Sequence, residues 1–351
     1  MSKGSNIKEE LRNREELLPL LEYFLKEKNP YFSFPEETGN KIRQTRINII
    51  VRNALFLSEF EQILENLKQA GISVILLKGL MMEGMYPDGL RTFSDIDLLV
   101  RKEDMCRAGM ILKRLGYSEN SEPRKEAVNI RKNAGYAKGG AVPVIVECHY
   151  RLGPCPYMDR PEPYRLFRDS RTVRIGNVDA RVLSYEDLLI HLALHIFSHI
   201  PNSCIVSVCD IRQIVTYCGD DIDWEVFIEK VDHYRLAMPV RFALEKAMEL
   251  FEIPIPAYVL GKLAEIKNGR RENFIFKLMK SRKTLPANLG KLFFGFRTVR
   301  KIRLILCMTF PSRRYILERY KSAKPGFFLF YYSRYIKENF TTAFLWLTDN
   351  L

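Results

Sequence analysis

The sequence predicts an α+β protein in which a mixed α/β unit lies between two helical segments. Apolar residues recur at helical spacing through residues 1–70, and short β-branched and apolar runs replace them between residues 71 and 183. Helical spacing returns from residue 184. We therefore expect an N-terminal helical segment (1–70) that packs on the core, an α/β domain (71–183) and a helical domain (184–351) with a basic C-terminal part.

Hydrophobic periodicity and turn residues predict the individual elements. The expected strands cover residues 72–77, 94–100 and 143–150, with a hairpin over 173–182. The expected helices cover residues 7–28, 46–70, 102–115, 188–200, 206–217, 224–234 and 239–251, with broken helical segments after residue 256.

The composition fits a globular protein with a sizeable core. The chain has 351 residues, of which 47% are hydrophobic and 28% are charged, a balance that excludes a disordered chain. The seven cysteines form no Cys-x-x-Cys pair, so we expect free thiols in a reducing cytoplasm. No run approaches the roughly 18 apolar residues of a transmembrane segment, and the first residues lack the apolar core of a signal peptide.

Positive charge is concentrated in the last quarter of the chain. Residues 261–351 contain 20 lysines and arginines against 5 aspartates and glutamates, a net charge of +15, whereas the whole chain has +13. Residues 1–260 therefore have a net charge of −2. Such a field attracts nucleic acid, phosphates or an anionic membrane surface, but a solvated basic face without a specific partner has the same composition.

Two aspartates in the second expected strand are the strongest functional signal. Side chains two residues apart on a strand point to the same side, so Asp95 and Asp97 are expected to project together. Adjacent carboxylates repel each other unless a cation lies between them, and hard oxygen ligands suit Mg²⁺ or Mn²⁺. A pair of solvent-exposed acids at a strand end is the alternative interpretation.

A third acid interrupts an apolar strand. Glu147 lies within residues 144–150, where an unpaired charge would be costly. If this strand pairs beside residues 94–100, Glu147 completes a three-carboxylate site for two metal ions that bind a triphosphate and activate a hydroxyl. His149 faces the same side of the strand and is expected to assist proton transfer or bind substrate. The alternative is a solvent-facing acid at the strand end.

A lysine and a glycine follow the first expected strand. Lys78 and Gly79 lie where this strand meets a short helical segment, a junction whose free backbone N–H groups suit phosphate. Gly79 allows the backbone to approach closely, and Lys78 adds a mobile positive charge. Arg91, four residues before Asp95, is expected to bind phosphates or orient the acidic loop, or else to be a surface charge.

Three histidines share one face of the helix expected over residues 188–200. His191, His195 and His199 are spaced by four residues, and Asp210 follows on the next helix. A single metal ion can use only two of them, because the first and third are ~12 Å apart along the helix. We favour a helix–helix interface in which Asp210 orients one of the histidines.

Together these motifs resemble a known superfamily. Their order (strand, Lys-Gly, helix, Arg-x-x-Ser-Asp-x-Asp, helix, strand with Glu) is similar to that of DNA polymerase beta-like nucleotidyltransferases. More closely, Leu77-Lys78-Gly79, the Asp95-x-Asp97 segment and Glu147-x-His149 resemble an uncharacterised bacterial nucleotidyltransferase family with a Leu-Lys-Gly signature. The phosphate turn departs from the Gly-Gly or Gly-Ser usual in the superfamily.

The resemblance implies a fold, a donor substrate and a site. The fold is a nucleotidyltransferase-like mixed β-sheet with helices packed on one side, the donor is an NTP, and the cofactor is Mg²⁺ or Mn²⁺. Asp95, Asp97 and Glu147 would be the catalytic and metal-binding residues. The residues expected to bind the nucleotide are Lys78, Gly79, Arg91, Ser94 and His149.

The resulting hypothesis is a cytoplasmic enzyme that transfers a nucleoside monophosphate from an NTP to a hydroxyl-type acceptor and releases pyrophosphate. The acceptor would be a small molecule, a protein side chain or an RNA end. Replacing both Asp95 and Asp97 by alanine is expected to abolish transfer and leave the fold intact, because it relieves their repulsion. Two alternatives are an inactive module that binds a nucleotide or a partner, and an RNA-binding protein that uses residues 261–351.

Overall fold

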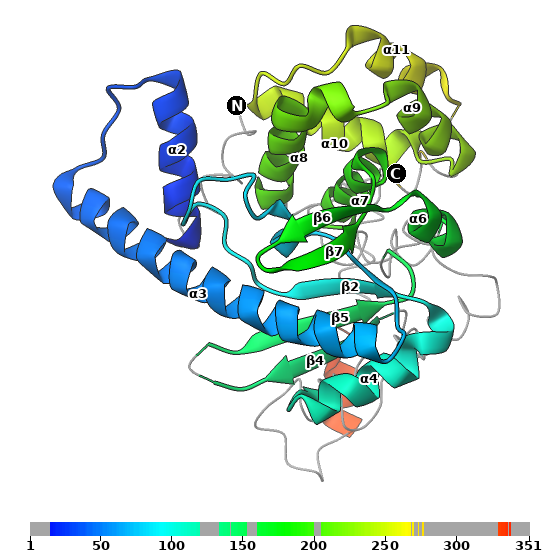
Figure 1. Cartoon of the computed structure of the whole chain (residues 1–351). Coiled ribbons are helices and arrows are strands. Elements are labelled where there is room, and N and C mark those ends of the chain that lie inside the picture. The colour runs from blue at the N-terminus through cyan, green and yellow to red at the C-terminus, as the bar shows by residue number, and fades with distance from the viewer. Residues whose placement is uncertain are drawn as a thin grey trace.

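The computed structural model describes residues 15–119, 133–140, 142–152, 160–199 and 205–267, together with 269, 273, 276, 329–335 and 337. Within these residues the predicted α+β fold is confirmed, with a mixed sheet and helices on one of its faces and a further helical region after it (Figure 1). Most of the basic segment 261–351 lies outside the described residues, as does the first part of the helix expected over 7–28.

The sheet has seven strands in the order β3-β4-β5-β2-β1-β7-β6. Strands β2 and β5 are parallel, as are β1 and β7, whereas the other neighbouring pairs are antiparallel. The parallel β2–β5 pair places the two acid-bearing strands side by side. The strands are β1 (Val74–Leu76), β2 (Ile96–Val100), β3 (Ser118–Glu119), β4 (Asn133–Lys138), β5 (Val144–His149), β6 (Arg171–Ile175) and β7 (Val178–Val182).

Two of these strands were not expected from the sequence. Strand β4 reads Asn-Ala-Gly-Tyr-Ala-Lys, a composition with low strand propensity, yet it pairs with the whole length of β5. Strand β3 has only two residues and pairs with β4. Pairing with a buried neighbour therefore decides the conformation of β4, and local propensity does not.

Helices α3 (Glu36–Gln69) and α4 (Met105–Arg114) lie on one face of the sheet (Figure 1). Helix α4 packs against α3, β3 and β5, and follows a 3₁₀ turn, η3 (Lys102–Asp104). A Cβ at Gly109 of α4 would overlap the hydroxyl of Tyr136 on β4, so a glycine is required for this close contact.

The N-terminal helices differ from the prediction in their limits. A 3₁₀ turn, η1 (Glu15–Leu17), precedes α2 (Leu18–Lys28), which packs against α3. Helix α3 begins ten residues before the expected position, and its polar first turns carry no apolar repeat. Two glutamates in the first turn, Glu36 and Glu37, interact favourably with the N-terminal end of the helix dipole.

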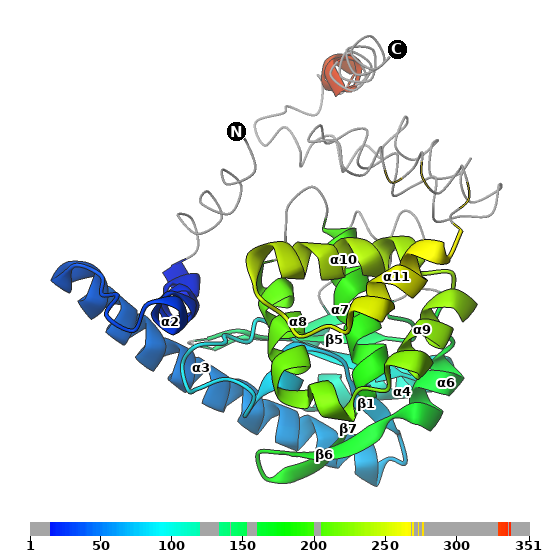
Figure 2. The ribbon, with the colours of Figure 1, turned by 90° about the horizontal axis from the view of Figure 1, so that it is seen from above.

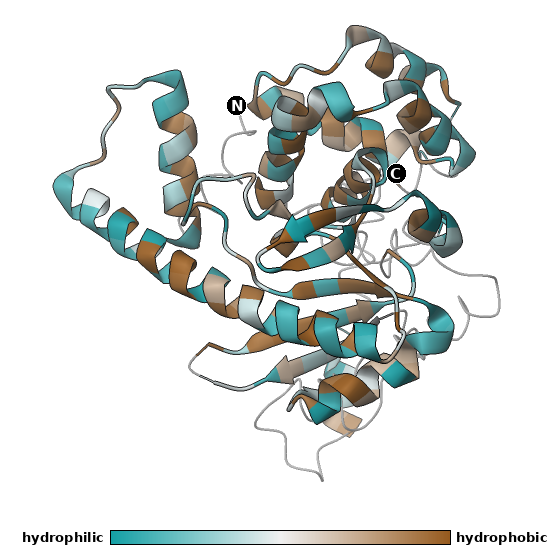
Figure 3. Cartoon of the chain, viewed as in Figure 1, coloured by the Kyte–Doolittle hydropathy of each residue, from teal (hydrophilic) through white to brown (hydrophobic). Residues whose placement is uncertain are grey.

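Exposed apolar side chains mark the middle of α3. Ile47, Ile50, Val51 and Leu55 are exposed, and Figure 3 shows this part of the helix as hydrophobic. The apolar spacing that predicted the helix is therefore only partly explained by the core. None of the described helices is long and apolar enough to cross a membrane.

The helical region begins at residue 184. The Ser184 Oγ accepts a hydrogen bond from the Asp187 backbone N–H at 3.2 Å and caps helix α7. Helices α7, α8, α9 and α10 pack on one another and gather into one group (Figure 2). The elements are α6 (Pro163–Asp169), α7 (Tyr185–Ser198), α8 (Ile205–Cys218), η5 (Gly219–Asp221), α9 (Trp224–His233), α10 (Ala237–Leu250) and α11 (Ala257–Glu265).

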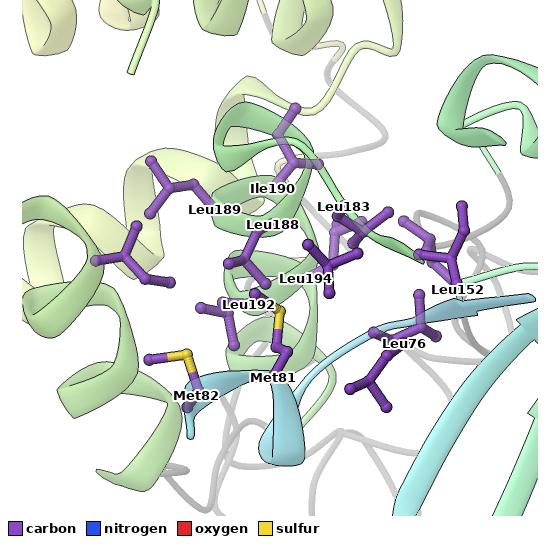
Figure 4. Packing of buried hydrophobic residues seen from close by; sticks show 14 of the residues in the cluster. Leu76, Met81, Met82, Leu152, Leu183, Leu188, Leu189, Ile190, Leu192 and Leu194 are labelled. Atoms are coloured by element: carbon purple, nitrogen blue, oxygen red, sulfur yellow. The ribbon is translucent and has the colours of Figure 1, made fainter. Parts of the chain in front are cut away.

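Helix α7 lies against the end of the first strand. Its leucines Leu188, Leu192 and Leu194 are buried with Leu76 of β1 and Met81 of the 3₁₀ turn η2 (Gly79–Met82) (Figure 4). One hydrophobic cluster thus includes residues from both sides of residue 184. The division into domains at that residue stays a prediction.

Candidate active site

The paired acids come from neighbouring strands. Asp97 on β2 is the register partner of Glu147 on β5, and the strands are parallel. Ligand atoms of Asp97, Glu147 and His149 all lie within 4.8 Å of one another, which makes them a possible metal-binding group within the described residues. Asp97 is 3% exposed, whereas the Glu147 side chain is 31% exposed. Strand pairing therefore brings these two acids together, with Glu147 on the solvent side.

His149 bridges the two carboxylates. Its Nε2 lies 2.9 Å from the Asp97 Oδ1 and 3.3 Å from the Glu147 Oε2. Burial alone would lower the pKa of His149, but hydrogen bonds to both carboxylates raise it to about 9. Its Nδ1 is buried and has no hydrogen-bond partner. With no metal ion bound, the two carboxylates therefore favour the protonated, cationic form of the imidazole.

Lys78 contacts the other oxygen of Asp97. Its Nζ forms an ion pair with the Asp97 Oδ2 and lies 3.7 Å from the Asp95 Oδ1. Burial would lower the pKa of Lys78, but the two carboxylates raise it. Burial would raise the pKa of Asp97, but Lys78 and His149 hold it well below its usual range. Asp97 is therefore an ionised acid between two cations.

Asp95 has a different environment. It precedes the first residue of β2, its side chain is 27% exposed, and its Oδ1 accepts a hydrogen bond from the Ser94 hydroxyl at 2.9 Å. Burial and the neighbouring Asp97 raise its pKa. Of the three predicted acids, Asp95 alone is absent from the 4.8 Å group, and it is connected to that group through Lys78.

The Lys78-Gly79 junction leads into a 3₁₀ turn of four residues, shorter than the expected helix. A turn of this length has little helix dipole to offer a phosphate. Gly79 has a φ of +65°, a conformation that favours glycine. The sequence therefore correctly indicates a backbone position that needs glycine. The expectation that a helix dipole attracts phosphate here is weakened, because the turn has only four residues.

Arg91 is held by the helical region. Its Nε and Nη2 donate to the two carboxylate oxygens of Asp210 on α8, each at 3.0 Å, and its Nη1 donates to the Thr92 carbonyl. The Tyr86 hydroxyl donates to the same Asp210 carboxylate at 3.0 Å. Asp210 is fully buried. Arg91 thus connects the acidic loop to α8, and both of its predicted roles, orienting that loop and binding phosphate, stay predictions.

Residues 83–95 connect η2 to β2, and we call this segment the approach loop. Asp210 of α8 holds one side of it, and helix α3 holds the other. Asn53 donates to the Arg91 carbonyl at 2.7 Å and accepts from the Phe93 N–H at 3.2 Å. Arg52 donates to the Phe93 carbonyl at 2.7 Å. The sequence interpretation missed both, although polar residues in an otherwise apolar helical repeat were the available signal.

Gly89 is required where the approach loop meets α3. It has a φ of +76°, and a Cβ there would lie 2.8 Å from the carbonyl oxygen of Arg46. Arg46 itself donates to the Asp88 carbonyl at 2.9 Å. The loop that ends at Asp95 is therefore attached to α3 along much of its length.

The three helix histidines lie outside the metal-binding group. His195 Nδ1 is 3.0 Å from the Ser207 hydroxyl of α8, and its ring centroid is 4.5 Å from that of His199. Asp210, expected to orient one of them, instead binds Arg91 and Tyr86. His191 is 2% exposed, and neither ring nitrogen has a hydrogen-bond partner. Burial, with the nearby charge of Lys78, lowers the pKa of His191 to about 3.

The donor set fits a divalent cation. Two carboxylates and an imidazole converge from adjacent strands, and the described partners of the Asp97 carboxylate are Lys78 and His149. Oxygen ligands suit Mg²⁺ and Mn²⁺, and an imidazole ligand favours Mn²⁺ of the two. Asp97, Glu147 and His149 are the residues that would hold the ion, with Asp95 beside them.

A mixed sheet that pairs the strand of Asp97, which begins directly after Asp95, with the strand of Glu147 is nucleotidyltransferase-like. Residues 10–252 match the model of a family described as uncharacterised nucleotidyltransferase, and the chain belongs to that family. It is accordingly a nucleotidyltransferase enzyme. A comparison with curated proteins gave no match.

Two solved structures are similar at 15% sequence identity. One is the solution structure of the antibiotic-resistance factor ANT(2'')-Ia, with 56% of this chain and 98% of that chain covered and a TM-score of 0.39. The other is the crystal structure of an antigenic nucleotidyltransferase-like protein from Paracoccidioides brasiliensis, with 63% and 94% covered and a TM-score of 0.34.

Proposed function

We propose that the enzyme transfers a nucleoside monophosphate from an NTP to a hydroxyl-type acceptor, with a divalent metal ion as cofactor. The observation that carries this proposal is the register pairing of Asp97 with Glu147 across β2 and β5. The acceptor would be a small molecule, a protein side chain or an RNA end. Asp95, Asp97 and Glu147 are the proposed catalytic and metal-binding acids.

The proposed reaction is a single displacement at the α-phosphorus. The acceptor oxygen forms a bond to this phosphorus while the bond to the bridging oxygen breaks, and pyrophosphate leaves with the electron pair. The partly exposed Glu147 is the acid that substrate reaches most easily, and it accepts the hydroxyl proton. A bound divalent ion would neutralise phosphate charge and lower the pKa of the attacking hydroxyl.

The proposed nucleotide contacts lie at the start of the approach loop and at its end. Lys78 supplies a positive charge, Gly79 allows close approach of the backbone, and the Ser94 hydroxyl can donate a hydrogen bond. Arg91 is expected to act mainly through the loop, because its guanidinium is bound to Asp210.

The test is a labelling experiment with the full chain. The protein is incubated with NTPs labelled at the α-phosphate, Mg²⁺ or Mn²⁺, and cell lysate fractionated into small molecules, protein and RNA. We expect label to enter one fraction with pyrophosphate release, and Glu147→Gln to reduce it by at least about a hundredfold. The fraction that takes up label identifies the acceptor class.

The control variant is Glu61→Gln, which changes a glutamate of α3 that hydrogen-bonds Asn177 in the β6–β7 turn. It should label as the unchanged protein does. Equal labelling by the Glu147→Gln and Glu61→Gln proteins would refute the assignment of Glu147.

A further inference from the structure

The strongest unexplained contact in the site is that of Lys78 with the acids. Its ammonium touches the Asp97 carboxylate and lies 3.7 Å from that of Asp95, with the Lys78 side chain 17% exposed. A lysine in this place satisfies the electrostatic need that a metal ion would satisfy. We propose that Lys78 is an internal cation of the metal-free site, which competes with the divalent ion for Asp97 and Asp95. This inference rests on the proposed function.

The charges around Lys78 support this role. The carboxylates of Asp95, just before β2, and of Asp97, within β2, repel each other, and Lys78 contacts both. Arg91 also acts on Lys78, but its repulsive charge is already paired with Asp210. Lys78 therefore stabilises the acids when no ion is bound, which explains how Asp97 remains charged while 3% exposed.

Lys78 and a metal ion exclude each other at close range. Even at the dielectric constant of water, a unit charge and a double charge ~4 Å apart repel by an amount that corresponds to more than about tenfold in a binding constant. An ion bound to Asp97 therefore requires the ammonium to leave this carboxylate. Lys78 lies two residues after the end of β1 and directly before the positive-φ Gly79, a position that gives it the phosphates of the nucleotide as a new partner.

The consequence is unusual and measurable: removing a positive residue strengthens metal binding. We expect Lys78→Met to bind Mn²⁺ at least about tenfold more tightly than the unchanged protein in the absence of nucleotide. Binding is measured by the loss of the free Mn²⁺ signal in electron paramagnetic resonance, a readout that does not depend on turnover. Lys78→Arg keeps the charge and should bind Mn²⁺ within about threefold of the unchanged protein.

The matched control is Lys138→Met. Lys138 is also a partly buried lysine in an ion pair, with Glu59 at 2.8 Å, but it lies on β4 away from the acids. Its replacement should leave Mn²⁺ affinity unchanged. Equal or weaker Mn²⁺ binding by Lys78→Met than by the unchanged protein overturns the inference.

Folding of the variant provides a second measurement. Without Lys78 the two aspartates repel each other, so we expect Mn²⁺ to raise the Tm of Lys78→Met more than that of the unchanged protein. Failure of both Lys78→Met and Lys78→Gln to fold at any Mn²⁺ concentration also overturns the inference, because a metal ion then does not replace the ammonium.

Asp97→Asn separates this inference from the proposed function. If Asp97→Asn abolishes Mn²⁺ binding while Lys78→Met does not strengthen it, the metal site stands and the role of Lys78 as a competitor fails. If Asp97→Asn binds Mn²⁺ as the unchanged protein does, the metal site of the proposed function fails.

Discussion

The acids and the loop that leads to them are held by different kinds of interaction. Asp97 and Glu147 are aligned by the backbone register of two parallel strands. The approach loop has no strand partner before β2 and is held by side chains of α3 and α8, 38 to 124 positions away in sequence. The placement of Asp97 and Glu147 therefore depends on sheet pairing, whereas the approach loop depends on a few long-range polar contacts.

The greatest loss of stability is expected from replacing Asp97, the buried acid. Asp97→Ala removes the partner of Lys78 and one partner of His149 and leaves buried positive charge, which should cost about 4 kcal/mol in the free energy of unfolding. Glu147→Ala changes a partly exposed side chain and should cost less than about 1 kcal/mol. Urea unfolding of the two variants measures both values.

Both variants should lose transfer, but only Asp97→Ala should lose stability. An intact fold after loss of both aspartates is expected only if relief of their repulsion is the main effect. Lys78 and His149 already neutralise Asp97, so the loss of these attractive contacts outweighs that relief. If the Asp97→Ala protein is as stable as the Glu147→Ala protein, charge compensation by Lys78 and His149 does not contribute to stability around Asp97, and strand pairing determines it.

The second-largest effect tests the approach loop, which side chains of α3 and α8 hold in place. Asp210→Asn leaves the Arg91 guanidinium without its buried carboxylate and should cost about 3 kcal/mol. Because the approach loop ends at Asp95, we expect kcat to fall while KM for the NTP changes little. A double-mutant cycle with Arg91→Met should give a coupling energy above about 1 kcal/mol.

Asp187→Asn is the control for Asp210→Asn. Asp187 is also a buried carboxylate in an ion pair, with Lys230 at 2.7 Å, but it belongs to α7 and makes no described contact with the approach loop. It should lower stability without lowering kcat beyond the loss of folded protein. Equal kcat values for the two variants would exclude a positioning role for Asp210.

The sequence predicts the strand-borne part of the site because its signals are local. An apolar run interrupted by Glu147 and an Asp-x-Asp segment each indicate a strand and a face. The hairpin β6–β7 is predicted for the same reason, from Gly176-Asn177 between two alternating runs. Periodicity of two residues is visible in a few positions and needs no knowledge of the partner.

The partners of the approach-loop residues cannot be predicted from such local patterns. Arg91 and Asp210 are 119 positions apart. The residues around Asp210 do not indicate that this buried aspartate pairs with Arg91 and not with a histidine of the neighbouring helix. The same applies to β4, which takes its strand conformation from β5, and to the early start of α3. Such features depend on which surfaces meet after folding, and one sequence gives no signal for that.

A smaller effect concerns His191 of α7, which lies near Lys78, Asp97 and His149. Its pKa is about 3 in the folded state and about 6.5 when unfolded, so the unfolded chain binds more protons below about pH 6.5. Stability from this group is fully present above that pH and is lost as the pH falls. At about pH 5 the loss should be about 2 kcal/mol relative to pH 7, and His191→Met should abolish it.

The measurement is the difference in unfolding free energy between the unchanged protein and His191→Met at the two pH values. His233→Gln, at an exposed position of α9, controls for the loss of a histidine. A difference that does not change with pH would mean that His191 finds a proton-binding partner in the folded protein.

The smallest effect is at the helix side of the approach loop. Asn53→Ala removes the hydrogen bonds to the Arg91 carbonyl and the Phe93 N–H and should cost about 1 kcal/mol. Asn66→Ala on the same helix is the control, because the Asn66 side chain bonds only the Gln62 carbonyl of its own helix. If α3 positions the loop, Asn53→Ala lowers kcat and Asn66→Ala does not. Equal kcat values would exclude a positioning role for Asn53 and would leave Arg52, which donates to the Phe93 carbonyl, as the α3 side chain nearest to Asp95 in the loop.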